Sequence, residues 1–307
     1  MKKGPMFLLL AMLIAWTIAR YGDRYVLHLA TMISIMGILA LSMNLMLRIG
    51  QLSIAHGAFM GMGAYASAIL TMRAGMSPPV ALVLGALITA VIAAVLGRFF
   101  LRIKGVYFVL LTYAFGQIIN LVFQDWTSLF GGNNGILGIP KFSWMNIDLA
   151  APSTYFVLTF IFLALAFVLT RWIFSSSMGA VLSSIDEDET LCQSLGANVL
   201  AWRSLVFVLS AVMASLAGGL YAHHVNFLTP EAFGFMLSVD LVVMNILGGV
   251  SAPLGPVLGA CILVLLPELL REVREFQMLA YGAILLLCLM YFKDGLIGLF
   301  HKRRGAR

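Results

Sequence analysis

Residues 154–170 read TYFVLTFIFLALAFVLT, a run of 17 residues without a charged side chain. Residues 204–222, SLVFVLSAVMASLAGGLYA, form a second such run. Between them lies a polar segment, residues 175–203, with the acidic stretch DEDE at 186–189. A helix needs about 20 mostly apolar residues to cross a bilayer. The two runs therefore predict membrane helices that flank a polar excursion into water.

The rest of the chain has the same character. Of its 307 residues 62% are hydrophobic and 10% charged, and the mean hydropathy is +1.01, whereas soluble domains carry about 25% charged residues. The apolar windows do not alternate in polarity as barrel strands would. The composition predicts an all-α polytopic membrane protein in one domain, residues 1–307. About ten spans are expected, near 5–19, 25–47, 57–72, 79–97, 105–123, 154–171, 204–222, 236–250, 254–270 and 276–292.

Lys2 and Lys3 precede the first apolar run and would also suit a signal peptide. The alternative is a first helix that is retained in the mature protein. We expect it to be retained, since nine further spans need an N-terminal partner.

The distribution of basic residues predicts the orientation. With ten spans and an internal N-terminus, 13 of the 19 Lys and Arg residues fall on the cytoplasmic side and 6 on the other. This bias follows the positive-inside rule and predicts that both termini are cytoplasmic. The excursion 175–203 is then cytoplasmic and the loop 124–152 extracytoplasmic. The basic tail at 301–304 suits anionic headgroups better than nucleic acid.

Several function classes find no support in the sequence. There is no phosphate-binding G-x-x-x-x-G-K-[ST] loop, no H-E-x-x-H and no G-x-S-x-G. Cys192, Cys261 and Cys288 form no metal motif, and the pair His223-His224 has no third ligand nearby in sequence, so we expect interfacial polar residues there. A proton-coupled carrier would show acids deep in several helices. Asp240 and Glu268 are both expected near membrane surfaces.

Two glycine-rich turns interrupt the apolar runs. Residues 50–61 read GQLSIAHGAFMG and residues 248–259 read GGVSAPLGPVLG. A shift of 198 residues superposes three glycines and a serine of these two turns. Interrupted helices at corresponding positions of two halves point to a transport pathway, although small residues for tight helix packing are an equally good interpretation.

Taken together, these features resemble the permease subunits of ATP-binding-cassette (ABC) importers for branched-chain amino acids, and specifically the longer of the two paired permeases. The resemblance spans roughly residues 30–295. Four stretches carry it: GQLS at 50–53 with GAF at 57–59 and GMGAY at 61–65; GVYF at 105–108 with Thr112 and AFG at 114–116; GGNNGI at 131–136; and LGG at 247–249 with GPVLG at 255–259.

The resemblance implies that the excursion 175–203 is an ATPase-coupling loop with two short helices. The matching residues are Gly179, Ile185, Glu187, Glu189, Leu195 and Gly196. Acids at 186–189 favour the start of the second short helix. An apolar docking stripe is expected from Leu182, Ile185, Leu191 and Leu195; a merely solvated connector is the alternative. The chain departs from the family pattern at Asp186, Asp188, Leu191 and Cys192.

Two further sets of residues are candidates for transport. The fifth span is the first place to expect the substrate path, because it carries polar side chains in a lipid environment: Tyr107, Thr112, Gln117 and Asn120, with Asn44, Ser53 and Asn245 as second-rank candidates. Gln117 stands where relatives often have an acid. The loop 124–152 suits either an external binding protein or the membrane interface, through Asp125, Trp126, Asn133, Asn134, Lys141, Trp144 and Asp148.

The resemblance thus implies a non-enzymatic transport subunit in the bilayer of a bacterial inner membrane. Its expected partners are a second permease, two ATPase subunits and an external binding protein, and no nucleic acid. The chain itself would bind no cofactor or metal and has no catalytic residue, whereas ATP and Mg would sit on the ATPase subunits. The alternatives are an importer permease for urea, amides, other amino acids or sugars, a self-sufficient secondary carrier, and an integral-membrane enzyme.

Overall fold

The computed structural model describes residues 4–144, 147–149 and 151–270, together with residues 282, 286, 295 and 296. Helices occur at nine of the ten expected windows. They are α1 (Gly4–Tyr21), α2 (Arg24–Leu47), α3 (His56–Ala74), α4 (Pro78–Phe100), α5 (Val106–Asp125), α7 (Pro152–Ser175), α10 (Val199–Val225), α11 (Phe235–Gly248) and α12 (Leu254–Leu269). The tenth window, 276–292, the basic tail and Cys288 lie outside the described residues, apart from positions 282 and 286.

Six segments of the described chain are long and apolar enough to cross a membrane. They are residues 24–47, 78–100, 106–125, 152–175, 199–225 and 230–248, whereas α12 is shorter. The protein is therefore a multi-pass helical membrane protein. Proline marks the start of α4 and α7, where the missing amide hydrogen costs nothing.

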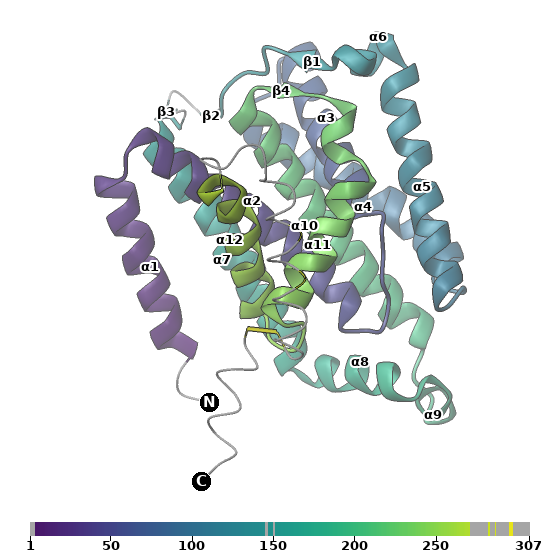
Figure 1. Cartoon of the computed structure of the whole chain (residues 1–307). Coiled ribbons are helices and arrows are strands. Elements are labelled where there is room, and N and C mark those ends of the chain that lie inside the picture. Colours follow the sequence, from purple (N-terminus) through teal and green to yellow (C-terminus); the bar gives the residue numbers. More distant parts are fainter. Residues whose placement is uncertain are drawn as a thin grey trace.

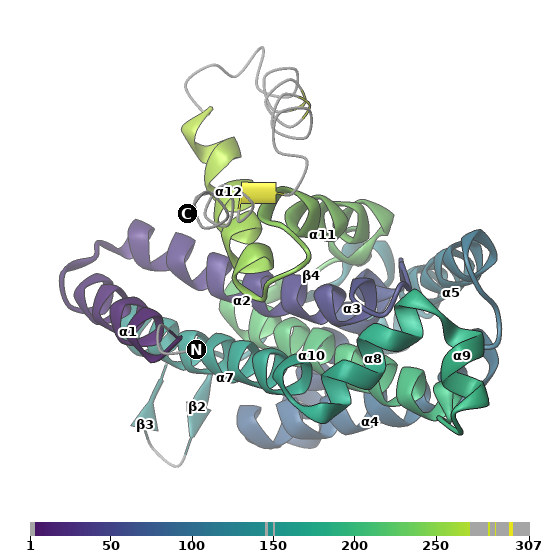
Figure 2. The same cartoon turned by 90° about the horizontal axis from the view of Figure 1, so that it is seen from below.

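The central helix of the bundle is α10. It packs against α3, α4 and α2, while α7 lies along α2, and α11 and α12 form a pair that covers α2. Figures 1 and 2 place α1 at one edge, beside α7, and α5 at the opposite edge. The contact between α1 and its neighbours is a small apolar cluster of Ala15, Leu27 and Phe156.

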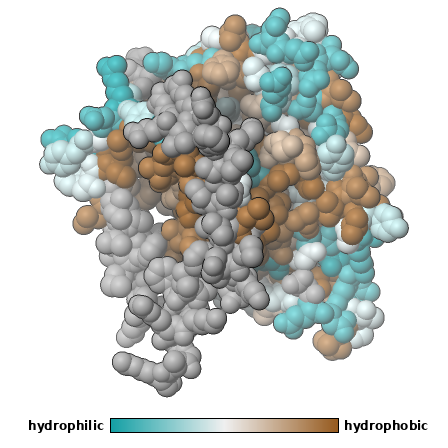
Figure 3. Space-filling view, viewed as in Figure 1, coloured by the Kyte–Doolittle hydropathy of each residue, from teal (hydrophilic) through white to brown (hydrophobic). Residues whose placement is uncertain are grey.

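Exposed apolar side chains follow the lipid-facing sides of α4 and α7. On α4 they recur every three or four residues, at Val80, Val83, Leu87, Val91, Val95 and Phe99. On α7 they lie at Val157, Ile161, Leu165, Val168 and Trp172. In Figure 3 hydrophobic side chains gather across the middle of the face shown, with hydrophilic ones toward its ends. The opposite side of α4 buries small residues such as Ala81, Gly85 and Ala93, which is how helices approach closely in lipid.

Short strands correct the expectation of a purely helical chain. The loop after α5 contains α6 (Thr127–Phe130), the 3-10 helix η1 (Gly132–Asn134), β1 (Ile136–Leu137), β2 (Ser143–Trp144) and β3 (Ile147–Asp148). Strand β1 pairs antiparallel with β4 (Phe227–Leu228), and β2 pairs with β3. The 3-10 helix η2 (Pro230–Phe233) leads into α11. The β1–β4 pair joins this loop to the end of α10, a non-local contact that apolar periodicity does not reveal.

The two polar excursions lie at opposite ends of the bundle. Helices α8 (Ser177–Glu187) and α9 (Glu189–Ser194) occupy one end, and the strands occupy the other (Figure 1). The sequence prediction of two short helices within 175–203 is confirmed. Gly179 lies within the first turn of α8, because helical geometry is interrupted at Ser176, between the end of α7 and the start of α8.

Candidate coupling loop and buried helix interruptions

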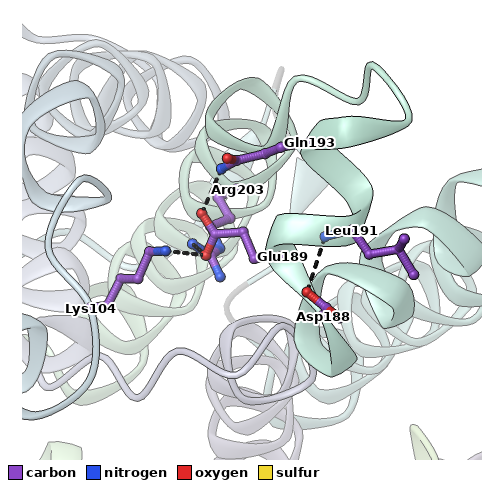
Figure 4. A network of polar contacts seen from close by, with 6 residues as sticks. All are labelled: Lys104, Asp188, Glu189, Leu191, Gln193 and Arg203. Atoms are coloured by element: carbon purple, nitrogen blue, oxygen red, sulfur yellow. Dashed lines mark hydrogen bonds and ion pairs between the residues drawn. The ribbon is translucent and has the colours of Figure 1, made fainter.

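Glu189 is the centre of a polar network that ties α9 to the bundle (Figure 4). One oxygen of its carboxylate lies 2.7 Å from Lys104 Nζ and 2.9 Å from Arg203 Nη1. Its other oxygen accepts a hydrogen bond from Gln193 Nε2 at 3.0 Å. Lys104 belongs to the loop between α4 and α5, and Arg203 to the first turns of α10. One carboxylate thus joins three separate segments.

The surroundings of this carboxylate favour its ionised form. The side chain of Arg203 is only 7% exposed and that of Glu189 16%. Burial works against ionisation of Glu189, but the hydrogen bonds and positive charges of Lys104 and Arg203 outweigh it, so the pKa of Glu189 lies below its ordinary value. Breaking a buried ion pair by removing one partner costs about 3–5 kcal/mol, so the network fixes α9 firmly against α10.

Two acids of the DEDE stretch thus have a structural role. Asp188 is the N-cap of α9 and accepts a hydrogen bond from the Leu191 amide at 3.0 Å, as expected for acids at the start of the second short helix. Asn198 caps α10 in the same way through the Ala201 amide. Glu187 is exposed, and the side chain of Asp186 lies outside the described residues. Asp188 is one of the departures from the family pattern, and capping accounts for it.

The four residues predicted to form an apolar docking stripe do not form one continuous exposed surface. Leu182 and Ile185 are buried, Ile185 in a cluster with Cys192 and Val199. Leu191 and Leu195 are 57% and 80% exposed. The loop therefore turns Leu182 and Ile185 toward the protein interior and leaves Leu191 and Leu195 on the surface.

Glycines shape this loop at two positions. A Cβ on Gly179 would lie 2.5 Å from the Phe174 backbone, so the start of α8 packs directly on the end of α7. Gly196 has φ +87°, a backbone conformation that is strained for residues with a Cβ. Nothing lies within 4 Å of the position that an added Cβ would occupy. Next to this region the guanidinium of Arg48 stacks over Phe174, 3.6 Å from the ring centroid. This cation–π contact joins the ends of α2 and α7.

The pH dependence of this loop follows from the pKa of Glu189. Because the folded pKa lies below the unfolded value of roughly 4.3, the network stabilises the loop fully above that pH and is lost as the pH falls through the folded pKa. We expect amide hydrogen exchange of residues 189–194, corrected for intrinsic rates, to be equally protected at pH 7 and pH 5 and to lose protection below about pH 4. Glu189→Gln should remove the transition. Protection that already falls between pH 7 and pH 5 would contradict the assignment.

The first glycine-rich turn lies inside the bundle, between α2 and α3. Its irregular backbone is satisfied by side chains from other helices: the Ile54 amide donates to Thr112 Oγ1 at 3.1 Å, and the Ile54 carbonyl accepts from Ser238 Oγ at 2.8 Å. The Gly57 amide donates to the same Ser238 hydroxyl at 3.0 Å. Unpaired backbone groups are costly in lipid, so Thr112 and Ser238 allow the chain to leave helical geometry here.

The second interruption, between α11 and α12, contacts α2 through two asparagines. Asn44 Nδ2 donates to Asn245 Oδ1 at 3.1 Å and to the Val250 carbonyl at 3.0 Å, while Asn245 Nδ2 donates to the Ala40 carbonyl at 3.0 Å. Both side chains are fully buried. Asn44 lies in the last turn of α2, which leads into the first interruption, and it binds the Val250 carbonyl of the second, so the second interruption packs against this end of α2.

The remaining path candidates divide into two groups. Asn120 donates from Nδ2 to the Pro230 carbonyl at 2.8 Å, and Gln117 is half-buried on the same helix. Thr112, Gln117 and Asn120 thus lie on the part of α5 that faces the bundle. Tyr107 does not join them, because it is 75% exposed at the start of α5. Ser53 is fully buried, and its Oγ has no hydrogen-bond partner among the described residues.

Residues that the sequence reasoning missed are those that hold these elements together. Lys104 and Arg203 were assigned only to the cytoplasmic charge count, yet both bind Glu189. Ser238 was not singled out. The signal available for Lys104 and Arg203 was the alternation of the spans, which places these two cations and Glu189 at the same end of the bundle.

In the loop 124–152, the side chain of Trp126 is 55% exposed and contacts Phe130 edge-on. Nothing in the described part of the chain holds three or more metal-ligating side chains together.

Buried helix interruptions in a multi-pass bundle point to a transport protein. Known proteins make the assignment specific. The family described as "Branched-chain amino acid transport system / permease component" matches residues 25–292, and the chain belongs to this family. The match runs from the second residue of α2 past the end of α12.

The individual relatives of this chain are also transport permeases. The chain is 28% identical to the high-affinity branched-chain amino acid transport system permease protein LivM of Escherichia coli, over 96% of this chain and 75% of LivM. It is 26% identical to LivH of Escherichia coli, over 81% of this chain and 86% of LivH. The ribose import permease protein RbsC of Escherichia coli is 25% identical over 84% of this chain and 82% of RbsC. No solved structure matches. The resemblance to the longer of the two paired permeases is confirmed by the greater share of the chain that aligns with LivM.

Proposed function

We propose that this chain is one transmembrane subunit of an ABC importer for branched-chain amino acids in a bacterial inner membrane. A second permease, two ATPase subunits and an external binding protein would complete the transporter, and ATP and Mg would bind only the ATPase subunits. Family membership over residues 25–292 carries the proposal. The relatives LivM and LivH, which are both named as permeases of one kind of transport system, support the pairing.

In the proposed orientation α8 and α9 lie in the cytoplasm with both termini, and the loop 124–152 lies outside. The basic residues of the described chain support this orientation. Six of them lie in helix ends or loops at the α8–α9 end of the bundle, and four lie at the strand end. The six are Arg48, Arg98, Arg102, Lys104, Arg171 and Arg203, and the four are Arg20, Arg24, Arg73 and Lys141.

The loop α8–α9 would dock on an ATPase subunit through its exposed leucines. Leu191 and Leu195 are large exposed apolar side chains on the same short segment, and short helices bind partner grooves through apolar side chains of this kind. Movement of the docked loop would reach the bundle through Glu189, because this residue is bonded to both α10 and the α4–α5 loop. Residues Gly179, Ile185 and Gly196 would keep the shape of the loop, and Glu187 would remain on its surface.

The substrate would pass close to the two helix interruptions. Thr112, Gln117 and Asn120 of α5, with Ser53 of the first turn, offer polar groups there. Asn44 and Asn245 bind each other, so they would control how the two interruptions separate rather than meet the solute directly. Changes at these turns are suited to alternating access, because irregular backbone can rearrange without breaking a regular helix.

Uptake by reconstituted vesicles tests the proposed cargo. Proteoliposomes that contain this chain with its neighbouring-gene products and internal ATP should take up leucine, isoleucine and valine, and only with the external binding protein. Ribose and urea are the informative alternatives, the first because RbsC is a relative. Binding-protein-dependent uptake of ribose but not leucine would overturn the cargo. Uptake by the single chain under an ion gradient, or ATP hydrolysis by it alone, would overturn the class of transporter.

Gly196 gives a prediction specific to the coupling loop. Gly196→Val should strain the backbone by about 1–2 kcal/mol without any clash, since the space around its Cβ position is empty. We expect normal membrane insertion but reduced transport and reduced ATPase stimulation by the loaded binding protein. Gly196→Asn should be affected less, because asparagine adopts positive φ more readily than valine. Equal stimulation in wild type and Gly196→Val would contradict the role of the turn.

A further inference from the structure

A cavity of about 200 Å³ lies at the strand end of the bundle, away from α8, α9 and the helix interruptions. It is formed by the beginnings of α2 and α7, the end of α10 and the loop before β2. Five basic side chains line it, Arg24, His28, Lys141, His223 and His224, and none of the lining side chains is acidic. The cavity is smaller than pockets for drug-sized ligands, which span roughly 300–1,000 Å³.

Arg24 and Lys141, the two cations that line this cavity, have no acidic partner among the described residues. Neither Arg24 nor Lys141 makes an ion pair among the described residues, where both ion pairs belong to Glu189. Asp23 is the N-cap of α2 and does not line the cavity. Helices α2 and α7 both begin here, and the positive end of a helix dipole favours a negative charge. Side chains and backbone thus present positive charge to the same small space.

His28 and His224 are arranged so that each keeps a nitrogen available. Nε2 of His224 lies 2.9 Å from Nδ1 of His28, and the rings stack with centroids 4.9 Å apart. The pair therefore uses one nitrogen of each imidazole and leaves the other. Tyr155 stacks on His224, while its hydroxyl donates to the Leu220 carbonyl at 2.6 Å. His223 also lines the cavity, but both of its ring nitrogens have partners, Ser67 Oγ and the Pro140 carbonyl.

We propose that this cavity binds a small oxyanion of the phosphate class, held by Arg24, Lys141 and the His28–His224 pair. Guanidinium, ammonium and imidazole groups are the common donors to phosphate oxygens. The ligand is either a free inorganic anion or the phosphate of an anionic lipid headgroup. A headgroup is a candidate because α2 and α7 begin at this end of the bundle, where the membrane surface is expected. The site is separate from the proposed substrate path and does not depend on the transported solute.

Thermal unfolding of the purified chain in nanodiscs separates the two sources. One arm uses phosphatidylcholine discs with inorganic phosphate, compared with chloride at equal ionic strength. The other arm compares phosphatidylcholine discs with discs that contain phosphatidylglycerol. A rise in Tm with inorganic phosphate identifies a free anion, and a rise only with phosphatidylglycerol identifies a headgroup; either result supports the site.

Variants connect the effect to the cavity. Arg24→Gln with Lys141→Gln should abolish the rise in Tm, whereas Arg20→Gln, which removes a cation at the same end outside the cavity, should retain it. If the double variant does not fold, Lys141→Gln alone, on an exposed side chain, should weaken the apparent affinity about tenfold. No rise in either arm, or an equal rise in wild type and the cavity variants, would overturn the proposal.

Discussion

Glu189→Lys should insert into the membrane normally and lose substrate transport by at least about tenfold. The substitution replaces the carboxylate that neutralises Arg203 and Lys104 with a third positive charge. Arg203 is largely buried, and leaving a buried charge unpaired costs about 3–5 kcal/mol. That is enough to release the short helix α9 from α10, while the apolar bundle that spans the membrane keeps its packing. Transport would fail because movement of the loop no longer reaches α10.

Two measurements separate this positioning role from a general loss of fold. Hydrogen exchange of residues 189–194 should rise in Glu189→Lys without any partner present, and should stay unchanged in Glu187→Lys, which reverses an exposed acid two residues away. The charge-swapped double variant Glu189→Arg with Arg203→Glu should recover part of the protection and part of the transport. Unchanged exchange at α9 in Glu189→Lys, or normal stimulated ATPase activity, would contradict the role of the network.

Gly218→Leu should abolish folding of the bundle. Helices α3 and α10 approach so closely that a Cβ on Gly218 would lie 1.9 Å from the Met60 carbonyl oxygen, and one on Gly63 would lie 2.1 Å from the Ser215 carbonyl oxygen. Backbone atoms of a helix cannot move aside as a side chain can, so the helices would have to separate. Overpacking of a core costs typically 1–3 kcal/mol and occasionally more, and here α10 is the centre of the bundle.

Even Gly218→Ala should lower the yield and the Tm, because the added Cβ itself meets backbone. Gly116→Ala is the matched control, since its Cβ would make an ordinary contact at 3.7 Å with the Ile54 carbonyl oxygen. In α5 this change should leave Tm the same or slightly higher, since alanine is favoured over glycine in a helix by about 1 kcal/mol. A Gly218→Leu protein that is monodisperse with wild-type Tm would show that α3 and α10 do not pack as described.

Periodicity and charge predicted the membrane helices well. Each apolar window among the described residues became a helix, because backbone in lipid must satisfy its own hydrogen bonds. The two short helices of the loop were implied by the family resemblance, and the acids at 186–189 favoured the start of the second. The sequence could not show which side of these short helices meets the bundle. Ile185 and Leu195 are both apolar residues at helical spacing, yet one is buried and the other 80% exposed.

The candidate path was predicted less completely. Thr112 and Asn120 were found as polar residues in lipid, but their partners, the Ile54 amide and the Pro230 carbonyl, are distant backbone groups. The Asn44–Asn245 bond joins residues 201 positions apart, and no local pattern encodes such a contact. Tyr107 has the same polar character, but it lies on the exposed side of α5. Which side of α5 is exposed depends on the helices that pack against it, and the local sequence does not show these.

Site-specific photo-crosslinking tests the central claim most directly. A photoreactive residue at position 195, on the exposed leucine of the coupling loop, should crosslink to an ATPase subunit in the assembled transporter. The same group at position 185, which is buried two residues before the end of the loop's first helix, should give no such product. A product between position 195 and the ATPase, absent at 185, is the predicted result. The absence of an ATPase product at position 195 in a transport-competent assembly would contradict the account.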